Sequence, residues 1–535
     1  MNAITRRQFA QSSAGLLLGS LIPGGIFGQA KTARRMTVLV DAAIGLVRPE
    51  LHGHFAEHLG SCVYGGIWVG RNSPIPNVNG FRKAAVDYLK ELGIPVLRWP
   101  GGCFADDYHW RDGIGPAARR PRSVNIHWGN YVEDNSFGTH EFIEFCRLIG
   151  AEPYLAANVG SGTPEEFRDW VEYCNYPSGS SLADERAANG FPQPFGVRYW
   201  GVGNENWGCG GSMRPEVYAA HYRRFATYGR SFANVRPYLI ACGPNGNDLR
   251  WSRGVLDGFE NRMPSGFAMH FYSSGSDPAT KFSVDAIKAQ LSSFVRVEQA
   301  VIQQRALLDS YDPARRVGLF LDEWGVWDRM DPGEEKTNGR LWQQATLRSA
   351  IAAGLGLNLF NRQADKLYMC NIAQMVNVLQ SVLLTDGPEG QKCVRTANYW
   401  AFMLFKPHRS KTAVRVETEG AAPAAAASPG ANQPVELDIS VSASRRDNEL
   451  VVTFVNPKHD AGMQVECGLR GASAREVSAQ ILTHNDYNAC NAFDAPDLIL
   501  PRTHVVRIED GSRLLLDLPP MSIVTATVRT IGKEE

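Results

Sequence analysis

Short apolar runs alternate with segments of helical periodicity between residues 50 and 372 of this 535-residue chain. The runs have the length and composition of buried strands: Leu51–Phe55, Val96–Trp99, Glu152–Ala157, Val197–Val202, Tyr238–Cys242, Gly266–Phe271, Val317–Leu321 and Asp365–Cys370. Between them, apolar residues recur every three or four positions, as in Phe81–Gly93, Thr139–Gly150 and Asp285–Asp309. Strands joined by helical crossovers predict an α/β fold, namely a (β/α)8 TIM barrel with parallel strands.

The pattern changes after about residue 395, where apolar and polar residues alternate without helical segments between the runs. Alternation with period two is typical of strands that bury one face. The runs are Val435–Val441, Glu449–Val455, Glu476–Leu482, His504–Ile508, Arg513–Leu518 and Ile523–Arg529. They predict a C-terminal antiparallel β-sandwich, jelly-roll-like in kind.

The expected domains are therefore a catalytic barrel over residues 49–394 and a sandwich over residues 395–535. Residues 31–48 contain one strand-like run, Met36–Val40, which we expect to join the sandwich. The segment Gly420–Pro434 is rich in alanine, proline and glycine, and its composition predicts a flexible loop without chemistry.

Residues 1–30 have the composition of a twin-arginine signal peptide rather than of the fold. Arg6 and Arg7 precede an apolar stretch over Ala14–Phe27, and Gly28-Gln29-Ala30 offers small residues for cleavage. An ordinary apolar N-terminus or a membrane anchor is the alternative. We therefore predict export by the twin-arginine route, to the periplasm or outside the cell, with no membrane attachment of the mature chain.

Charge and cysteine content exclude several classes of function. Lys+Arg and Asp+Glu both number 55, and no basic run stands out, so neither nucleic acid nor an anionic membrane is an expected partner. The ten cysteines show no CxxC pair or zinc-ligand spacing, so we expect mostly buried thiols, with room for one bridge. His52, His54 and His58 surround Glu57 without the HExxH spacing, so we expect no metal and no cofactor.

Polar side chains stand at the end of almost every predicted barrel strand. Active groups of TIM barrels lie at the C-terminal ends of the strands. The residues at these positions are Glu57, Arg98, Asn158, Asn204, Glu205, Asn245, His270, Tyr272, Glu323, Asn371 and Gln374. One or two such residues would be ordinary caps or ion pairs, whereas a ring of them predicts a site.

Two glutamates in this ring are placed to act together. Glu205 and Glu323 fall on the fourth and seventh predicted strands, whose ends face each other across the mouth of an eight-stranded barrel. Glycoside hydrolysis needs such a pair, one acid to protonate the leaving oxygen and one carboxylate to attack or to activate water. Taken singly, Glu205 could instead bond backbone amides, and Asp322-Glu323 could pair with an arginine.

Five blocks of the sequence carry a resemblance to a known family. They are His54–Gly60 (HFAEHLG), Leu97–Asp106 (LRWPGGCFAD), Tyr108–Trp110 with Asp112–Pro116, Gly203–Glu205 and Leu321–Trp324. Together they resemble glycoside hydrolase family 51, chiefly α-L-arabinofuranosidases, from about Leu51 to the end of the chain. The FxEHLG and RWPGG blocks are specific, whereas GNE is shared by many barrel glycosidases.

The resemblance implies an exo-acting, retaining α-L-arabinofuranosidase that releases terminal arabinose from plant polysaccharides or oligosaccharides. By the same match, Glu205 is the acid/base and Glu323 the nucleophile. The expected sugar contacts are Glu57, Arg98, Asn204, Tyr272 and Gln374. A plain buried ion pair between Arg98 and Glu57 is the alternative for those two residues. The resemblance also leans towards a homo-oligomer.

Cys103 and Trp128 are two further candidates for contact with the sugar. Cys103 follows PGG, where some members of the family have asparagine and others have cysteine, and a thiol bonds a hydroxyl only weakly. Trp128, on the predicted loop Asn125–Asn130, is either a stacking platform for a sugar face or a core residue.

Two other functions stay open at this point. One is an endo-β-1,4-glucanase or β-xylosidase on the same barrel, whose mouth would be a long groove rather than a pocket. The other is a non-catalytic carbohydrate-binding protein. That reading predicts the loss of a carboxylate, yet Glu205 and Glu323 are both present.

Overall fold

The structure is a computed structural model that describes residues 32–387, 390–419 and 435–532. The predicted signal peptide and the predicted loop Gly420–Pro434 lie outside these residues. Over the described part of the chain, no helix has both the length and the apolar character needed to cross a membrane.

Eight parallel strands close into a barrel, which confirms the predicted TIM fold. In order around the barrel they are β2 (Gly53–Phe55), β5 (Val96–Trp99), β8 (Glu152–Ala157), β9 (Tyr199–Val202), β10 (Tyr238–Ala241), β11 (Gly266–Ser274), β12 (Gly318–Trp327) and β13 (Leu367–Ala373). The strands read as continuous apolar runs because both of their faces are buried. Tyr154, Phe320 and Met369 belong to a small buried cluster drawn from these strands, while Leu155, Leu321 and Cys370, one position along, belong to the larger core.

Helices surround the barrel and pack mostly against their neighbours in the ring. They are α1 (Lys83–Leu92), α2 (Thr139–Ile149), α3 (Pro164–Asn175), α5 (Pro215–Tyr228), α6 (Leu249–Phe259), α7 (Val284–Tyr311), α9 (Leu347–Arg362) and α10 (Ala397–Phe405), with α4 (Ser181–Ala188) and α8 (Pro332–Asn338) as short additions. Helix α10 contacts α1 and α9, so the helical ring continues past residue 394, where the sequence pattern had placed the end of the barrel.

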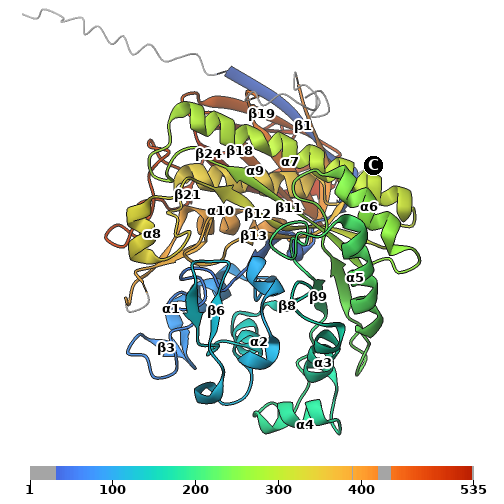
Figure 1. Cartoon of the computed structure of the whole chain (residues 1–535). Helices are drawn as coiled ribbons and strands as arrows, with labels where there is room; N and C mark the ends of the chain where they lie inside the picture. Colours follow the sequence, from blue (N-terminus) through green and yellow to red (C-terminus); the bar gives the residue numbers. More distant parts are fainter. Residues whose placement is uncertain (1–31, 388–389, 420–434, 533–535) are drawn as a thin grey trace, which may run out of the picture.

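A ten-stranded sheet forms the second domain (Figure 1). Its order is β21 (Arg502–Thr503), β20 (Ala472–Thr483), β24 (Ser522–Gly532), β18 (Glu449–Asn456), β17 (Ser440–Arg446), β16 (Thr412–Thr418), β1 (Thr32–Leu46), β19 (Met463–Arg470), β23 (Arg513–Leu518) and β22 (Arg507–Glu509). Strand β20 also contacts β19 and β22, so the sheet folds over its own apolar core. All pairs are antiparallel except β1 with β19, which is parallel.

Helix α9 lies between the barrel and the sheet. It contacts β12 on one side and β16, β17, β18 and β24 on the other. A side chain at Gly354 would bring its Cβ within 2.9 Å of Ile523 Cδ1, so glycine permits this close approach. The two domains therefore share a continuous apolar contact.

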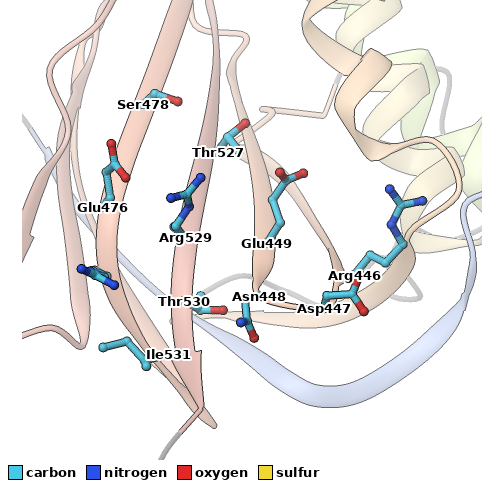
Figure 2. A pocket seen from close by; sticks show the side chains of 11 residues that line it. Arg446, Asp447, Asn448, Glu449, Glu476, Ser478, Thr527, Arg529, Thr530 and Ile531 are labelled. Carbon is cyan, nitrogen blue, oxygen red and sulfur yellow. The ribbon is translucent and has the colours of Figure 1, made fainter.

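The sheet domain also carries a surface hollow of about 600 Å³. Figure 2 shows that acidic and basic side chains from neighbouring strands, among them Glu449, Arg529 and Glu476, line it. No aromatic side chain is among the lining residues, so the hollow offers no stacking surface for a sugar. None of the predicted site residues lies there.

Candidate active site

Glu205 lies in the loop after β9 with a left-handed backbone, at a φ of 44°. This conformation is uncommon for residues other than glycine and persists where the surroundings impose it. Gly203, just before it, also has a positive φ of 85°, and a Cβ there would lie 2.2 Å from Asn206 Oδ1. The amides of Gly208 and Gly210 donate to the Glu205 carbonyl at 2.7 and 3.2 Å, which closes the loop tightly.

Glu323 lies within β12, next to a β-bulge. Leu321 is opposite Met269 on β11, but Glu323 is opposite His270, so Asp322 is the extra residue. Alternation along a regular strand would direct two consecutive side chains to opposite faces. The bulge instead allows the carboxylates of Asp322 and Glu323 to reach the same arginine, Arg98.

Arg98 lies on β5 and joins three acidic or amide groups. Its Nη1 donates to Glu323 Oε1 at 2.6 Å and its Nη2 to Asn204 Oδ1 at 2.5 Å, while its Nε lies 3.4 Å from Asp322 Oδ2. Burial alone would lower the pKa of Arg98, but the charges of Asp322 and Glu323 raise it above its ordinary value. The possible ion pair of Arg98 with Glu57 is replaced by these contacts.

The carboxylates of Glu205 and Glu323 face each other across His270. One oxygen of each carboxylate and a ring nitrogen of His270 lie within 4.8 Å of one another. His270 Nδ1 is 2.8 Å from Glu205 Oε1 and 3.5 Å from Glu323 Oε2. Burial lowers the pKa of His270, but the charges of Glu323 and Glu205 raise it overall above its ordinary value. A protonated His270 therefore offsets the repulsion between the two carboxylates.

The surroundings of Glu323 favour its ionised form. Burial raises its pKa, but the opposing effects of His270, Arg98 and a hydrogen bond from Tyr272 leave it below the ordinary value. The Tyr272 hydroxyl donates to Glu323 Oε2 at 2.7 Å. Burial and the charge of Glu323 hold the pKa of Tyr272 well above its usual range, so this hydroxyl keeps its proton.

Glu57 is 2% exposed and accepts three hydrogen bonds beside this pair. Trp128 Nε1 donates to its Oε1 at 2.8 Å, and Gln374 Nε2 donates to its Oε2 at 3.0 Å. The amide of Phe104 is the third donor, at 3.1 Å. Burial and the charge of Glu323 raise the pKa of Glu57 to about 7.

Asp106 is a site residue that the sequence did not single out. Its carboxylate accepts from the amide of Asn204 at 2.7 Å and from the amides of Val159 and Gly160 at 2.7 and 2.8 Å. It thereby ties the loop that carries Glu205 to the loops after β5 and β8. Its position within the LRWPGGCFAD block was the available signal.

Cys103 is joined to Cys209 by a disulfide across 106 positions of sequence. This is the one bridge among the described cysteines, and the other eight are free thiols. A bonded sulfur has no hydrogen to donate, so the weak thiol contact with a sugar that we considered for Cys103 is absent in this form. No sequence pattern pairs these two cysteines.

The remaining residues of the predicted ring divide between the site and its support. Asn371 donates to Asp322 Oδ1, whereas Asn158 bonds the backbone of its own loop and Asn245 is exposed. Trp128 is half-buried, packs against the main core and donates to Glu57, and its role as a stacking platform for a sugar stays a prediction.

Groups that could hold a metal ion are confined to the site itself within the described ranges. They are Glu205 with His270 and Glu323, and Glu205 with the two disulfide sulfurs. The histidines around Glu57 have other partners: His58 bonds Glu133, His52 accepts from Arg409, and the His54 ring packs at a tilt against Phe402.

Comparison with known proteins gives one consistent picture. The chain matches the family "Alpha-L-arabinofuranosidase 1 domain" over residues 88–286 and "Alpha-L-arabinofuranosidase C-terminal domain" over residues 322–522. An intracellular exo-alpha-L-arabinofuranosidase of Bacteroides ovatus is 41% identical over 502 residues, which cover 93% of this chain and 96% of the relative.

Solved structures agree with this similarity. The GH51 arabinofuranosidase from Xanthomonas axonopodis pv. citri matches with a TM-score of 0.87 and 39% identity, over 93% of this chain and 100% of that one. The alpha-L-arabinofuranosidase from Thermotoga maritima in its arabinose complex matches with a TM-score of 0.81 and 29% identity, over the same shares.

The prediction of export to the periplasm or outside the cell is wrong. The relative from Bacteroides ovatus, similar over nearly its whole length, is named an intracellular enzyme. Two arginines before a short apolar stretch form a pattern of composition, and composition alone does not demonstrate recognition by an export machinery.

Proposed function

The chain belongs to the α-L-arabinofuranosidases of glycoside hydrolase family 51, and we propose that it releases terminal arabinofuranosyl residues with net retention of configuration. The observation that carries this proposal is the approach of the Glu205 and Glu323 carboxylate oxygens to within 4.8 Å. Retaining glycosidases hold their carboxyl groups about 5–5.5 Å apart, whereas inverting ones need about 6.5–9.5 Å to admit a water molecule.

Glu323 is the proposed nucleophile. Its pKa lies below the ordinary value in spite of burial, because His270 and Arg98 stabilise the negative charge. Only the ionised carboxylate can attack the anomeric carbon and form the glycosyl-enzyme. Arg98 and Tyr272 each bond one of its oxygens, which fixes the direction of attack.

Glu205 is the proposed acid/base. Its side chain is 18% exposed, against 6% for Glu323, so it stands nearer to solvent and to a departing group. In the first step it would give its proton to the leaving oxygen while Glu323 attacks. In the second step it would take a proton from water, which then displaces Glu323 from the sugar.

Other polar groups of the site are the proposed sugar contacts. Asn204 Nδ2 and Gln374 Oε1 are buried and have no hydrogen-bond partner among the described residues. A donor and an acceptor of this kind can be satisfied by sugar hydroxyls, with Asn204 suited to the 2-hydroxyl. Glu57, Arg98 and Tyr272 would complete the contacts, and the half-buried Trp128 is a candidate stacking surface.

The burial of the proposed sugar-binding residues supports exo action. Counted with their backbone, Glu57, Asn204, Glu323 and Gln374 are at most 4% exposed, so a single terminal residue suits the site better than an internal stretch of polymer. The relative from Bacteroides ovatus is also named an exo-enzyme. The proposed substrates are arabinose-containing plant polysaccharides or their oligosaccharides. We also propose a homo-oligomer, which light scattering of the purified chain would test.

Proton NMR of the first product from a 4-nitrophenyl α-L-arabinofuranoside tests retention directly. The α-anomer should form first and then equilibrate, and an initial β-anomer would refute the mechanism. Digestion of linear arabino-oligosaccharides tests exo action, for which arabinose and the oligosaccharide shortened by one residue should be the only early products. A spread of shorter oligosaccharides from the start would indicate endo cleavage, and activity confined to a β-xylopyranoside would favour the xylosidase alternative.

A further inference from the structure

The Cys103–Cys209 disulfide lies at the mouth of the barrel beside the reacting groups. Cys103 begins the short helix Cys103–Asp106 after β5, and Cys209 lies in the loop after β9. Strand β8 lies between β5 and β9 in the barrel order, so the bridge joins loops that are not neighbours in the barrel. It therefore ties the Glu205 loop to the loop after β5, a connection that the hydrogen bonds between β8 and β9 do not provide.

The bridge touches the proposed acid/base. Cys209 Sγ lies 3.6 Å from Glu205 Oε2, and both sulfurs lie within 4.8 Å of a Glu205 carboxylate oxygen. The other oxygen, Oε1, is bonded to His270. One oxygen of the Glu205 carboxylate is thus hydrogen-bonded to the His270 ring. The other oxygen contacts a disulfide sulfur, which has no hydrogen to donate.

The backbone of Glu205 depends on such restraint. A positive φ is strained for a residue with a side chain, so it persists only where neighbours impose it. Two connections from the loop after β5 hold this loop: the bonds of Asp106 to Asn204 and Asn206, and the disulfide. Loss of either one would let Glu205 relax away from His270.

The bridge is also within reach of a reductant. Both of its cysteines are half-buried, whereas six of the eight free thiols in the described residues are buried. A small dithiol at the barrel mouth can therefore meet the disulfide without unfolding the chain. Exchange needs access of this kind to one of the two sulfurs.

We propose that the Cys103–Cys209 disulfide is a redox-sensitive brace for Glu205, and that a dithiol reductant converts the enzyme into a form with impaired acid/base catalysis. One thiolate of the reductant attacks a sulfur of the bridge and forms a mixed disulfide, and the displaced cysteine takes up a proton. The second thiolate of the reductant then releases the other cysteine, which is also protonated. Two electrons and two protons pass to the protein, and the dithiol leaves as its own disulfide.

Reduction acts on Glu205 in two ways. The loop loses its covalent tie to the loop after β5, which frees the strained backbone of Glu205. Cys209 also gains a hydrogen, and a thiol at this position donates to Glu205 Oε2 and stabilises the ionised carboxylate, the form that cannot protonate a leaving group. In the disulfide-bonded structure, His270, Tyr272 and Glu323 face Glu205, and Arg98 and Cys242 lie nearby.

The test compares a substrate whose leaving group must be protonated by Glu205 with one whose leaving group departs without protonation. The full chain is purified in air, treated with dithiothreitol, and assayed on an arabino-oligosaccharide and on a 2,4-dinitrophenyl α-L-arabinofuranoside. Because general acid catalysis contributes about 100-fold or more, kcat/KM on the oligosaccharide should fall at least ~10-fold, while kcat/KM on the dinitrophenyl substrate should fall about twofold or less. Reoxidation should restore the loss, and thiol titration should count two additional thiols in the reduced protein.

Variants provide the matched controls. The double variant Cys103→Ser/Cys209→Ser should behave as the reduced enzyme does and should not respond to dithiothreitol. Cys490→Ser alters a half-buried free thiol outside the site, and its response should equal that of the unchanged chain. Should the double variant fail to fold, as circular dichroism would show, the reduced natural chain gives the decisive measurement.

Three results would overturn the proposal. They are the absence of the bridge in the air-purified chain by mass spectrometry, full oligosaccharide activity after complete reduction, and an equal fall on both substrates. The inference rests on the proposed role of Glu205, so Glu205→Ala is assayed in parallel. If kcat/KM of Glu205→Ala falls equally on both substrates, Glu205 is not the acid. If it falls only on the oligosaccharide but reduction has no effect, the role of Glu205 stands and only the proposed role of the disulfide is refuted.

Discussion

Glu205 and Glu323 are the same residue type in different surroundings, and these surroundings separate their proposed roles. Glu323 is held by Arg98 and Tyr272 and has a lowered pKa. Glu205 contacts His270 on one side and the disulfide on the other, and it is the more exposed of the two. At this scale the chemistry follows from hydrogen bonds and charges within a few ångströms.

Replacement of each glutamate should therefore have a different consequence. Glu323→Ala should abolish turnover of every substrate, and azide should restore activity with an azide product of inverted configuration. In Glu205→Ala, kcat/KM should fall about 100-fold or more on oligosaccharides but little on dinitrophenyl arabinofuranoside, because that leaving group needs little protonation. Its kcat should fall on both substrates, because the glycosyl-enzyme accumulates without a base to activate water. Azide should rescue this variant with a product of retained configuration.

NMR of the azide products decides between the two assignments. Glu165→Ala, on an exposed side chain of α3, serves as the control and should keep full activity. A retained azide product from Glu323→Ala would mean that the roles are reversed.

Glu57 should make stability depend on pH. Its pKa is raised in the folded state from 4.5 to about 7, so the folded chain binds this proton more tightly than the unfolded chain does. Its contribution is therefore most favourable at low pH and is lost as the pH rises through that interval, by at most about 3 kcal/mol. Glu57→Gln should remove this dependence.

The free energy of unfolding in urea, measured for both proteins between pH 5 and pH 8, checks this. The unchanged chain should lose stability relative to Glu57→Gln as the pH rises. A difference that stays constant over this range would show that Glu57 titrates at its ordinary pKa.

At the scale of elements, two local irregularities build the site on a regular barrel. The bulge in β12 brings Asp322 and Glu323 to one arginine, and the tight loop after β9 turns Glu205 towards His270. Gly210 lies where this loop passes closest to its neighbours: a Cβ there would be 2.0 Å from the Asn204 carbonyl oxygen and 2.4 Å from Asp106 Oδ2. The loop cannot accept a methyl group at this position without moving.

Gly210→Ala should therefore lower kcat by about 10- to 100-fold, because small displacements of catalytic groups are costly. Gly208→Ala is the matched control in the same loop, since its Cβ would meet its nearest neighbour at 3.6 Å, an ordinary contact. Steady-state kinetics with a thermal unfolding curve for each variant would test this. Equal kcat values for the two variants would contradict the proposed tightness of the loop.

At the scale of the whole molecule, the sheet domain supports the barrel through α9. This helix is buried along almost its whole length, between β12 and the strands of the sheet. Ile523 on β24 is fully buried against Gly354 of α9, while Ile531 on the same strand is 53% exposed. The barrel and the sheet should therefore unfold together.

Ile523→Ala should destabilise the chain by about 2–5 kcal/mol through the cavity that it leaves, and Ile531→Ala by less than about 0.5 kcal/mol. Urea unfolding followed by circular dichroism and by loss of activity would measure both. In Ile523→Ala the two signals should shift together, and a sheet that melts before activity is lost would show independent domains.

The amino-acid sequence by itself determined the barrel and the place of its polar residues. Burial on both faces of a parallel strand gives an apolar run, and every predicted barrel run overlaps a strand of the structure. Counting the runs along the chain then assigned Glu205 and Glu323 to the ends of the fourth and seventh barrel strands. These features were predictable because the burial of a strand determines the residue types at consecutive positions of the sequence.

Only the tertiary structure decided how these residues act on one another. Arg98 with Glu323, Asp106 with Asn204 and Cys103 with Cys209 are pairs about 100 positions or more apart. Such contacts depend on where a bulge falls and how a loop closes, and those local geometries leave no periodic signal in the sequence. The parallel pairing of β1 with β19 was hidden for the same reason, since it joins strands from opposite ends of the chain.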